Sequence, residues 1–290
     1  MIPPRVLLAA HNLRAKKRLG QNFLTDSAMA ERIVECSGIS RKDIVLEIGA
    51  GLGALTIPAA RAAKKVYAID IDRQIMDILK VQILASNLSN VVIMEKNILR
   101  LDIEELAEKE GGEFIVMGNL PYNISSQILV QLIESRISVK RAILMFQKEL
   151  ARRITAQPCS KDYGRLTVML QYCAEIEKLV DVKAPHFFPK PKVDSEVLEI
   201  RFQKTPKYLA HNEAFLFSVI KAAFGKRRKT LKNALAGSAL DIDAGNALNV
   251  LENAGVDPVR RAETLSVQEF VKLSNVLSER KQNEEKLRPA

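Results

Sequence analysis

Asp43-Ile44-Val45-Leu46-Glu47-Ile48-Gly49-Ala50-Gly51-Leu52-Gly53 is the segment that determines the fold class of this chain. It runs from a short apolar stretch, Ile44–Ile48, through a glycine-rich turn into a segment of helical length that begins near Ala54. A short apolar run that ends at such a turn is typical of a buried strand. A buried strand that leads directly into a helix indicates a parallel sheet wrapped by helices.

The same alternation of apolar runs and amphipathic segments continues along the chain as far as Phe202. Strands are predicted at Ile44–Ile48, Val66–Asp70, Val91–Met94, Phe114–Met117, Arg141–Phe146, Ile176–Val180 and Val197–Phe202. These seven runs, alternating with helical segments, predict an α/β fold with a mostly parallel sheet. Residues 185–191 hold three prolines and two phenylalanines between the last two strands, which predicts a loop.

The pattern changes after Pro206, where the strand signal stops. Helical periodicity follows in Glu213–Phe224, Thr230–Ala236, Ala244–Ala254 and Ser266–Ser278. We therefore predict a sheet domain over residues 1–205, whose first 25 residues form a basic N-terminal segment, and a small all-helical domain over residues 206–280. The charged and polar stretch 281–290 is predicted to be a frayed tail.

The composition favours a cytoplasmic protein that binds a polyanion. Lys and Arg number 44 against 34 Asp and Glu, and the resulting net charge of +10 favours nucleic acid through counterion release. The three cysteines are widely spaced and form no CxxC pair, so they indicate neither a disulfide framework nor a zinc site. No apolar run approaches the roughly 20 residues of a membrane span. We expect a cytoplasmic monomer without a membrane segment or a metal.

The glycine turn is a candidate cofactor site. Glycines let the backbone approach a ligand closely, and the N-terminus of a helix favours electronegative groups. The turn lacks the two-residue gap before the last glycine of the dinucleotide-binding fingerprint. In addition, Glu47 would repel a pyrophosphate but attract a sulfonium or ammonium group. S-adenosylmethionine carries both of these cations and no phosphate, so Glu47, Gly49 and Gly51 are candidate contacts for it. Alternatively, Glu47 caps a helix or pairs with a basic residue.

Two polar residues at strand ends extend the predicted cofactor site. Asp70 ends the second strand about 20 residues beyond the glycines, where an acid accepts the ribose hydroxyls. Asn97 follows the third strand, from which a polar side chain could reach the adenine amino group. An ordinary loop asparagine explains Asn97 equally well. Asp72, two residues after Asp70, is interpreted as a helix N-cap.

Asn119-Leu120-Pro121-Tyr122 follows the fourth strand and is a candidate methyl-transfer site. Adenine N6 is a poor nucleophile because its lone pair is delocalised into the ring, so a site must hold its N–H groups in hydrogen-bond acceptors. Asn119 offers a side-chain carbonyl, and Leu120, kept extended by Pro121, offers a backbone carbonyl. Tyr122 offers a stacking face, a contact worth about 1–3 kcal/mol. The alternative is a plain turn after a strand.

Six motifs occur together in one order and give the chain a specific resemblance. They are Lys17–Leu24, Glu47–Gly53, Gly118–Ser125, Tyr163–Leu166, Pro191–Ser195 and Phe224–Leu231. With them the chain resembles the bacterial small-subunit ribosomal RNA adenine dimethyltransferases of the KsgA type, from about Arg14 to Leu273.

This resemblance implies a class I methyltransferase core and S-adenosylmethionine as the methyl donor. It also implies N6,N6-dimethylation of two adjacent adenosines in the loop of the 3′-terminal hairpin of 16S rRNA, and a role in small-subunit biogenesis. Carried over by motif, the cofactor contacts are Asn22, Leu24, Gly49, Asp70, Asn97 and Asn119. Many relatives have Glu where this chain has Asp70, and Asp where it has Asn97, so one charge is absent here.

The target adenine and the RNA need further residues. If the adenine is flipped from its loop, Tyr122 can stack on one side, and Phe187 is the candidate for the other, while Phe188 is expected to pack in the core. RNA contact is predicted for the basic cluster Lys226, Arg227, Arg228 and Lys229. We expect this cluster at the start of a helix, where cations oppose the helix dipole and a phosphate partner explains them better than a solvated face.

Three other functions remain open from the sequence. A large-subunit rRNA adenine methyltransferase of the antibiotic-resistance type would share the core and its chemistry. A ribosome-assembly or transcription factor could use the same fold for binding alone. A dehydrogenase is disfavoured by Glu47 and by the segment Asn119–Tyr122.

Overall fold

The chain forms two compact units. A computed structural model describes residues 2–121, 123–226 and 228–286. The first unit combines Met1–Ala151 with Glu175–Lys204, and the second combines Arg152–Ala174 with Thr205–Ala290. The units divide near residue 205, and residues 152–174, which were predicted in the sheet domain, belong to the helical unit. The reason is long-range packing: the Tyr172 ring meets the Phe217 ring edge-on, 6.0 Å away.

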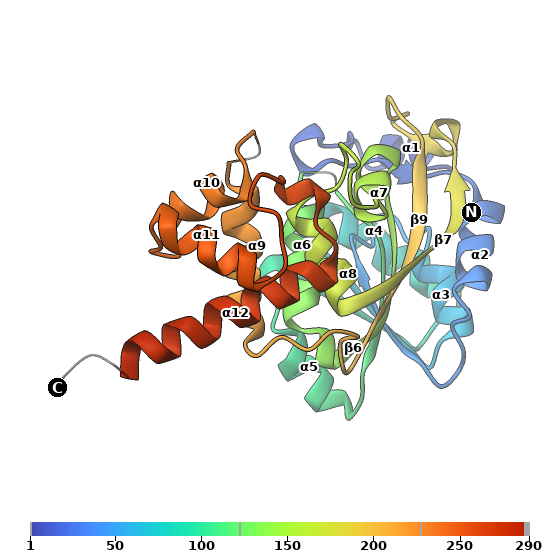
Figure 1. Cartoon of the computed structure of the whole chain (residues 1–290). Helices are drawn as coiled ribbons and strands as arrows, with labels where there is room; N and C mark the ends of the chain where they lie inside the picture. Colours follow the sequence, from blue (N-terminus) through green and yellow to red (C-terminus); the bar gives the residue numbers. More distant parts are fainter. Residues whose placement is uncertain (1, 122, 227, 287–290) are drawn as a thin grey trace. The chain divides into compact units, whose positions relative to one another are not determined.

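A seven-stranded sheet, of which Figure 1 labels β6, β7 and β9, forms the centre of the first unit. Its strand order is β4-β3-β2-β5-β6-β9-β7. Its strands are β2 (Ile44–Ile48), β3 (Lys65–Asp70), β4 (Val91–Glu95), β5 (Phe114–Asn119), β6 (Val139–Gln147), β7 (Ala174–Val182) and β9 (Ser195–Phe202). The four pairings among β4, β3, β2, β5 and β6 are parallel, whereas β9 runs antiparallel to β6. All seven predicted strands and the mostly parallel sheet are confirmed.

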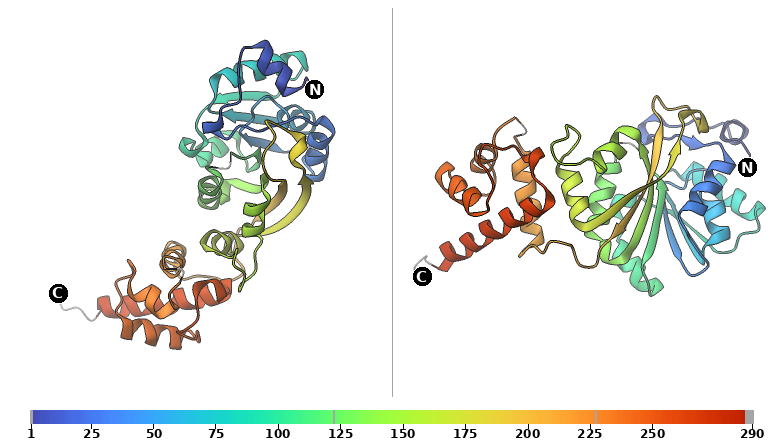
Figure 2. Two further views of the ribbon diagram at one scale, coloured as in Figure 1. Left: turned by 90° about the horizontal axis from the view of Figure 1, so that it is seen from above. Right: turned by 45° about the vertical axis from the view of Figure 1, so that its right-hand side comes forward.

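Helices cover both faces of this sheet, and the blue and green helices lie on opposite sides of it in the right-hand view of Figure 2. Every side chain of β2 is buried, as expected for a central parallel strand covered on both faces. On one face, Ile33 and Ala59 pack with Val45 and Ile115 in one apolar cluster. The helices of this unit are α1 (Pro4–Ala10), α2 (Ser27–Cys36), α3 (Thr56–Ala62), α4 (Arg73–Ala85), α5 (Ile103–Glu110) and α6 (Ser125–Glu134). Helix α7 (Lys148–Ile154) begins in this unit and ends in residues assigned to the second.

A second, two-stranded sheet joins distant parts of the first unit. Strand β1 (Phe23–Leu24) pairs antiparallel with β8 (Phe187–Phe188), which lies in the proline-rich stretch predicted as a loop. The Thr25 backbone amide and hydroxyl both donate to the His186 carbonyl oxygen, at 2.8 and 3.0 Å. The N-terminal segment and the proline-rich stretch are therefore held together directly.

The second unit is helical, as predicted. It contains α8 (Arg165–Cys173), α9 (Glu213–Phe224), α10 (Leu231–Ala236), α11 (Ala244–Asn253) and α12 (Val267–Lys286). Helix α12 includes residues 281–286, which were predicted to fray, while residues 287–290 lie outside the described part of the chain. Among residues 2–121, 123–226 and 228–286, no helix is both long enough and apolar enough to cross a bilayer.

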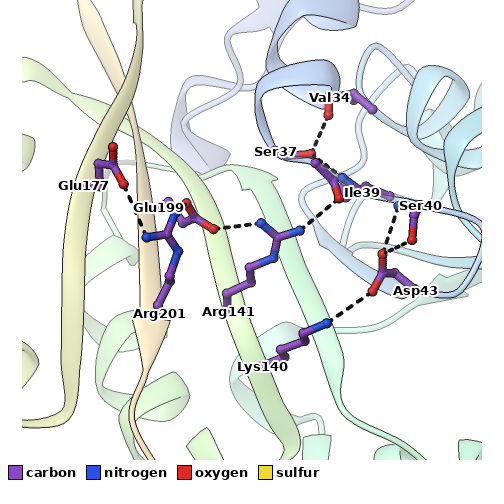
Figure 3. A network of polar contacts seen from close by, with 11 residues as sticks. Val34, Ser37, Ile39, Ser40, Asp43, Lys140, Arg141, Glu177, Glu199 and Arg201 are labelled. Atoms are coloured by element: carbon purple, nitrogen blue, oxygen red, sulfur yellow. Dashed lines mark hydrogen bonds and ion pairs between the residues drawn. The ribbon is translucent and has the colours of Figure 1, made fainter.

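An ion-pair network lies at the edge of the sheet where β2 and β6 begin (Figure 3). Glu199 is only 2% exposed, and its carboxylate lies 2.8 Å from the Arg141 guanidinium and also contacts Arg201. Arg141 donates a further hydrogen bond of 3.2 Å to the Gly38 carbonyl oxygen, and Arg201 pairs with Glu177 at 3.3 Å. A buried carboxylate is tolerated when it is paired and hydrogen-bonded in this way. The network therefore joins β6 and β9 to the loop before β2.

Candidate active site

A cavity opens at the other edge of the sheet, beside the carboxyl ends of β2, β3 and β5. It holds about 990 Å³ not filled by protein atoms, a volume that includes space open to solvent. The N-terminal segment forms one wall with residues Leu19, Gly20, Gln21, Asn22 and Phe23. The glycine turn, the ends of β3 and β5 and the loop after β4 form the others.

The glycine turn brings main chain close to the cavity. Gly51 has φ +53°, in the left-handed region that favours glycine, and a Cβ there would lie 3.3 Å from the Phe23 ring. Gly118, just before the end of β5, has no room for a side chain, because a Cβ would lie 2.4 Å from the Ile48 carbonyl oxygen. Both glycines allow segments that line the cavity to approach one another. Gly49 and Gly51, the predicted cofactor contacts in this turn, line the cavity.

Asp70 ends β3 and lines the cavity. Its two carboxylate oxygens accept hydrogen bonds of 3.0 Å from the backbone amides of Gly51 and Asp72. Burial raises the pKa of Asp70 above its usual value, and these backbone bonds oppose that shift. Because a carboxylate can accept about four hydrogen bonds, Asp70 keeps capacity for hydroxyl groups of a ligand.

Asn97 also lines the cavity, and it begins the short 3₁₀ helix η2 (Ile98–Arg100). Its Oδ1 accepts a hydrogen bond of 3.1 Å from the Leu99 backbone amide. The same side chain therefore caps a turn and borders the cavity.

The segment after β5 presents two carbonyl groups. Asn119 Nδ2 donates a hydrogen bond of 2.8 Å to the Asn22 carbonyl oxygen, which fixes the side-chain amide and leaves its Oδ1 as an acceptor. Within the described residues, no hydrogen bond reaches the Leu120 carbonyl oxygen, whereas the Leu120 amide donates to Met145 at 3.3 Å. Asn119, Leu120 and Pro121 all line the cavity. Tyr122, predicted to stack on the base, lies outside the described residues.

Glu47 and Leu24, which were predicted to contact the cofactor, are not among the residues that line the cavity. Glu47 is 1% exposed, and its Oε2 has no partner within the described part of the chain. Burial, with a contribution from the nearby Asp70, raises the pKa of Glu47 to about 8, so its carboxyl group is mostly neutral at pH 7. The expected attraction for a cation is therefore lacking in this state. The Leu24 side chain is 2% exposed and packs in the apolar core.

Phe187, predicted to stack on the base, lies in the core instead. The Phe187 side chain is 3% exposed and packs in the same core cluster as Leu24, so it does not border the cavity. Phe188 is partly buried against a smaller cluster that includes Leu8 and Phe23. The antiparallel pairing of β1 with β8, which the sequence did not indicate, turns Phe187 inward. A base could stack on Phe187 only after its side chain leaves the core.

The basic cluster lies in the second unit, in the turn between α9 and α10. Lys226, Arg228 and Lys229 are exposed, and within the described residues none of them forms an ion pair, while Arg227 lies outside those residues. The cluster was predicted at the start of a helix, but it follows the C-terminus of α9. Cations are favoured at a helix C-terminus, so the helix dipole accounts for part of this charge.

Sequence reasoning missed an apolar part of the cavity. Ile71 is 52% exposed although it is large and apolar, and it lines the cavity together with Ile98 and Leu99. The sequence did contain a signal for Ile71, because it lies between Asp70 and Asp72 directly after a buried strand. In the described ranges, no three His, Cys, Asp or Glu side chains lie close enough to hold a metal ion.

Comparisons with known proteins agree with this architecture. The family model for ribosomal RNA adenine dimethylase matches residues 12–279. Ribosomal RNA small subunit methyltransferase A of Desulforapulum autotrophicum is 52% identical over 277 residues, which cover 96% of this chain and 97% of that protein. A dimethyladenosine transferase from Plasmodium falciparum matches with a TM-score of 0.74 and 28% identity, covering 90% of this chain and 98% of that one. The 23S rRNA methyltransferase ErmE matches with a TM-score of 0.66 and 25% identity, covering 88% and 99%.

Proposed function

The chain belongs to the ribosomal RNA adenine dimethylase family, and we propose that it dimethylates N6 of two adjacent adenosines in the loop of the 3′-terminal hairpin of 16S rRNA. The enzyme class, an S-adenosylmethionine-dependent rRNA adenine dimethyltransferase, follows from the family. The small ribosomal subunit or its precursor is the proposed substrate, because relatives at up to 52% identity are named as small-subunit methyltransferases. A role in subunit biogenesis accompanies this substrate.

The cavity fits S-adenosylmethionine in the chemistry of its walls. Asp70 can accept hydrogen bonds from ribose hydroxyls, and Ile71 and Leu99 offer apolar surface to an adenine ring. Asn97 and the backbone around Gly49 supply polar groups at the same cavity. When bound, this cofactor supplies a methyl group made electrophilic by a sulfonium.

The orientation of the Asn119 amide is the observation that carries the proposal. Because Nδ2 is engaged with the Asn22 carbonyl, Oδ1 remains to accept a hydrogen bond from the target N6. The Leu120 carbonyl is the second acceptor, and its neighbour Pro121 keeps it in an extended backbone. Two acceptors hold the amino group and leave its lone pair directed at the methyl donor.

Positioning supplies most of the acceleration in this mechanism. Holding two reactants in a reactive geometry can contribute roughly 7–11 kcal/mol, so a general base is not required. The N6 proton becomes acidic only once the nitrogen is alkylated, and it leaves to water. A monomethylated adenosine has one N–H group, so the second transfer can use only one of the two acceptors, Asn119 or Leu120.

Replacing Asn119 with Ala tests this assignment. We expect methyl transfer to fall at least about 100-fold, because removing one preorganised polar group at a reacting centre costs that much in comparable sites. Loss of the hydrogen bond to Asn22 should weaken binding of S-adenosylhomocysteine only severalfold. Turnover is measured with labelled cofactor, and Asn246→Ala, the same chemical change in α11, is the control. Near-normal turnover of the Asn119 variant would refute the role.

The RNA target is tested by offering unmethylated small and large ribosomal subunits to the enzyme with labelled S-adenosylmethionine. Mass analysis of the nucleosides should show N6,N6-dimethyladenosine in small subunits alone, and primer extension should stop at the two loop adenosines. Label in the large subunit would instead support methylation of 23S rRNA, the substrate named for ErmE.

A further inference from the structure

Asp72 stands at the N-terminus of α4 but does not cap it. Its carbonyl oxygen accepts the first helical hydrogen bond, from Met76 N at 3.0 Å, while its side chain makes no capping bond. The side chains of Asp26, Asp102 and Asp243 do cap their own helices. A capping Asp stabilises its helix. Asp72 therefore differs from the others in that its carboxylate is used elsewhere.

The carboxylate of Asp72 is directed at the N-terminal segment. It is 4% exposed, with one oxygen 2.7 Å from Lys16 Nζ and the other accepting a hydrogen bond of 2.8 Å from Gln21 Nε2. The Lys16 backbone amide in turn donates to Gln21 Oε1 at 2.8 Å. The three side chains thus close a ring around the turn that contains η1 (Lys17–Leu19).

This ring lies at one end of the cavity wall. Residues 19–23 line the cavity, and their other fixed point is the hydrogen bond from Asn119 to the Asn22 carbonyl oxygen. Between the two points, Gly20 has φ +66° and lies close to Pro121, so that a Cβ there would be 3.4 Å from the proline ring. The wall is therefore held by Asp72 on one side and by Asn119 on the other.

We propose that Asp72 is a positioning residue that fixes the N-terminal segment as a wall of the cavity by holding Lys16 and Gln21. Its backbone amide also donates to Asp70, so the same turn orients the proposed ribose acceptor. The identity of the ligand rests on the proposed function. The holding of the segment itself does not, because it follows from contacts within the chain.

Replacing Asp72 with Asn keeps its shape but puts an amide donor opposite the Gln21 amide or the Lys16 ammonium. Calorimetry should show S-adenosylhomocysteine binding weakened about tenfold, the usual effect of losing a charge-assisted hydrogen bond. The KM for S-adenosylmethionine should rise by a similar factor, with kcat at saturation changed less than about twofold, because the chemistry lies at Asn119.

Gln21→Glu offers a rescue that a simple helix-capping role would not show. By itself, this change places a second carboxylate against that of Asp72 and should weaken binding. Combined with Asp72→Asn, it restores complementary donors and acceptors and the net charge, and affinity should return to within about threefold of wild type. Asp102→Asn is the matched control, because Asp102 caps α5 outside the cavity wall.

Trypsin provides a readout that needs no cofactor. Lys17 and Arg18 are exposed in η1, so loosening the segment should speed cleavage there about tenfold in Asp72→Asn, since cleavage follows the population of the open segment. The double variant should again resemble wild type. Unchanged affinity and unchanged cleavage in Asp72→Asn, or failure of the rescue, would overturn the proposal. If wild type bound no S-adenosylhomocysteine, the proposed function would fail, and the cleavage experiment would still decide the role of Asp72.

Discussion

Glu47 makes the stability of the chain depend on pH through a single side chain. Its carboxyl group is buried in the central strand β2 with no basic partner among the described residues, and burial raises its pKa to about 8 from 4.5. A raised pKa in the folded state means that folding holds a proton which the unfolded chain releases. The stabilisation from this proton is complete below the unfolded pKa and is lost as the pH rises through the folded pKa.

Glu47→Gln should therefore remove a pH dependence. Between pH 4.5 and 8, the difference in unfolding free energy between the variant and wild type should grow in favour of the variant, by about 1.4 kcal/mol for each pH unit. Thermal unfolding at several pH values measures it. Parallel pH profiles for the two proteins would show that Glu47 titrates normally.

The location of a site residue could be predicted from the sequence where the residue ends a parallel strand. Asp70 and Asn119 end parallel strands, so both were expected at one edge of the sheet, and both line the cavity. Phe187 and Glu47 could not be placed in this way. The burial of Phe187 depends on its pairing with Leu24, far away along the chain, and on the same side Thr25 is bonded to His186, 161 residues away. The neutral state of Glu47 depends on the absence of a nearby cation, which no local pattern reports.

At the scale of secondary-structure elements, strands β6 and β9 each place an arginine against the same buried carboxylate, and the two arginines differ in how far they are shielded from solvent. Arg141 and Arg201 are opposite each other in the antiparallel pairing, and both contact Glu199. The Arg141 side chain is 18% exposed, whereas that of Arg201 is 51% exposed. Both residues are arginines that contact Glu199, but the ion pair with Arg141 is better shielded from solvent and should contribute more to stability.

Arg141→Met should destabilise the chain by about 3 kcal/mol, because it leaves the buried Glu199 carboxylate without its best-shielded partner. Arg201→Met should cost about 1 kcal/mol or less, as is usual for an exposed pair. Urea denaturation measures both changes. A double change, Arg141→Met with Glu199→Gln, should recover part of the loss. Equal costs for the two arginines would contradict the asymmetry.

The elements themselves were largely predictable. Apolar runs bounded by turn residues located all seven strands of the large sheet, and helical periodicity located α9–α12. The two-residue strands β1 and β8 were not predicted, because each is too short to show a period of two. The basic turn was misplaced because its residues lie between two helices whose ends are separated by only a few residues.

For the molecule as a whole, the charge excess is expected to act through RNA. In the second unit, Lys226, Arg228 and Lys229 are exposed without ion pairs among the described residues. Phosphate contacts release counterions, so binding that depends on them falls steeply as salt increases. We propose that this turn contacts the ribosomal RNA and that the cavity selects the atom to be methylated.

Reversing all three charges to Glu should weaken binding of small subunits and lower the slope of log K against log salt by about 2. S-adenosylhomocysteine binding should not change, since the turn contributes no residue to the cavity. Filter binding over a salt series measures the slope, and Lys272→Glu on α12 is a control of the same charge change in the same unit. An unchanged slope would exclude phosphate contact by this turn.

The second unit is built from two stretches of chain, and this has a consequence for biosynthesis. Helix α8 lies in the first stretch, and Tyr172 packs against Phe217 of α9 in the second. Domains fold from the N-terminus as they are synthesised. On the translating ribosome, α8 therefore emerges before its partner helix α9. Val168 and Leu170, both fully buried in the finished protein, are exposed to solvent until α9 has been synthesised. That interval is when a chaperone would bind this chain most readily, and a fragment beginning at residue 205 would lack α8 altogether.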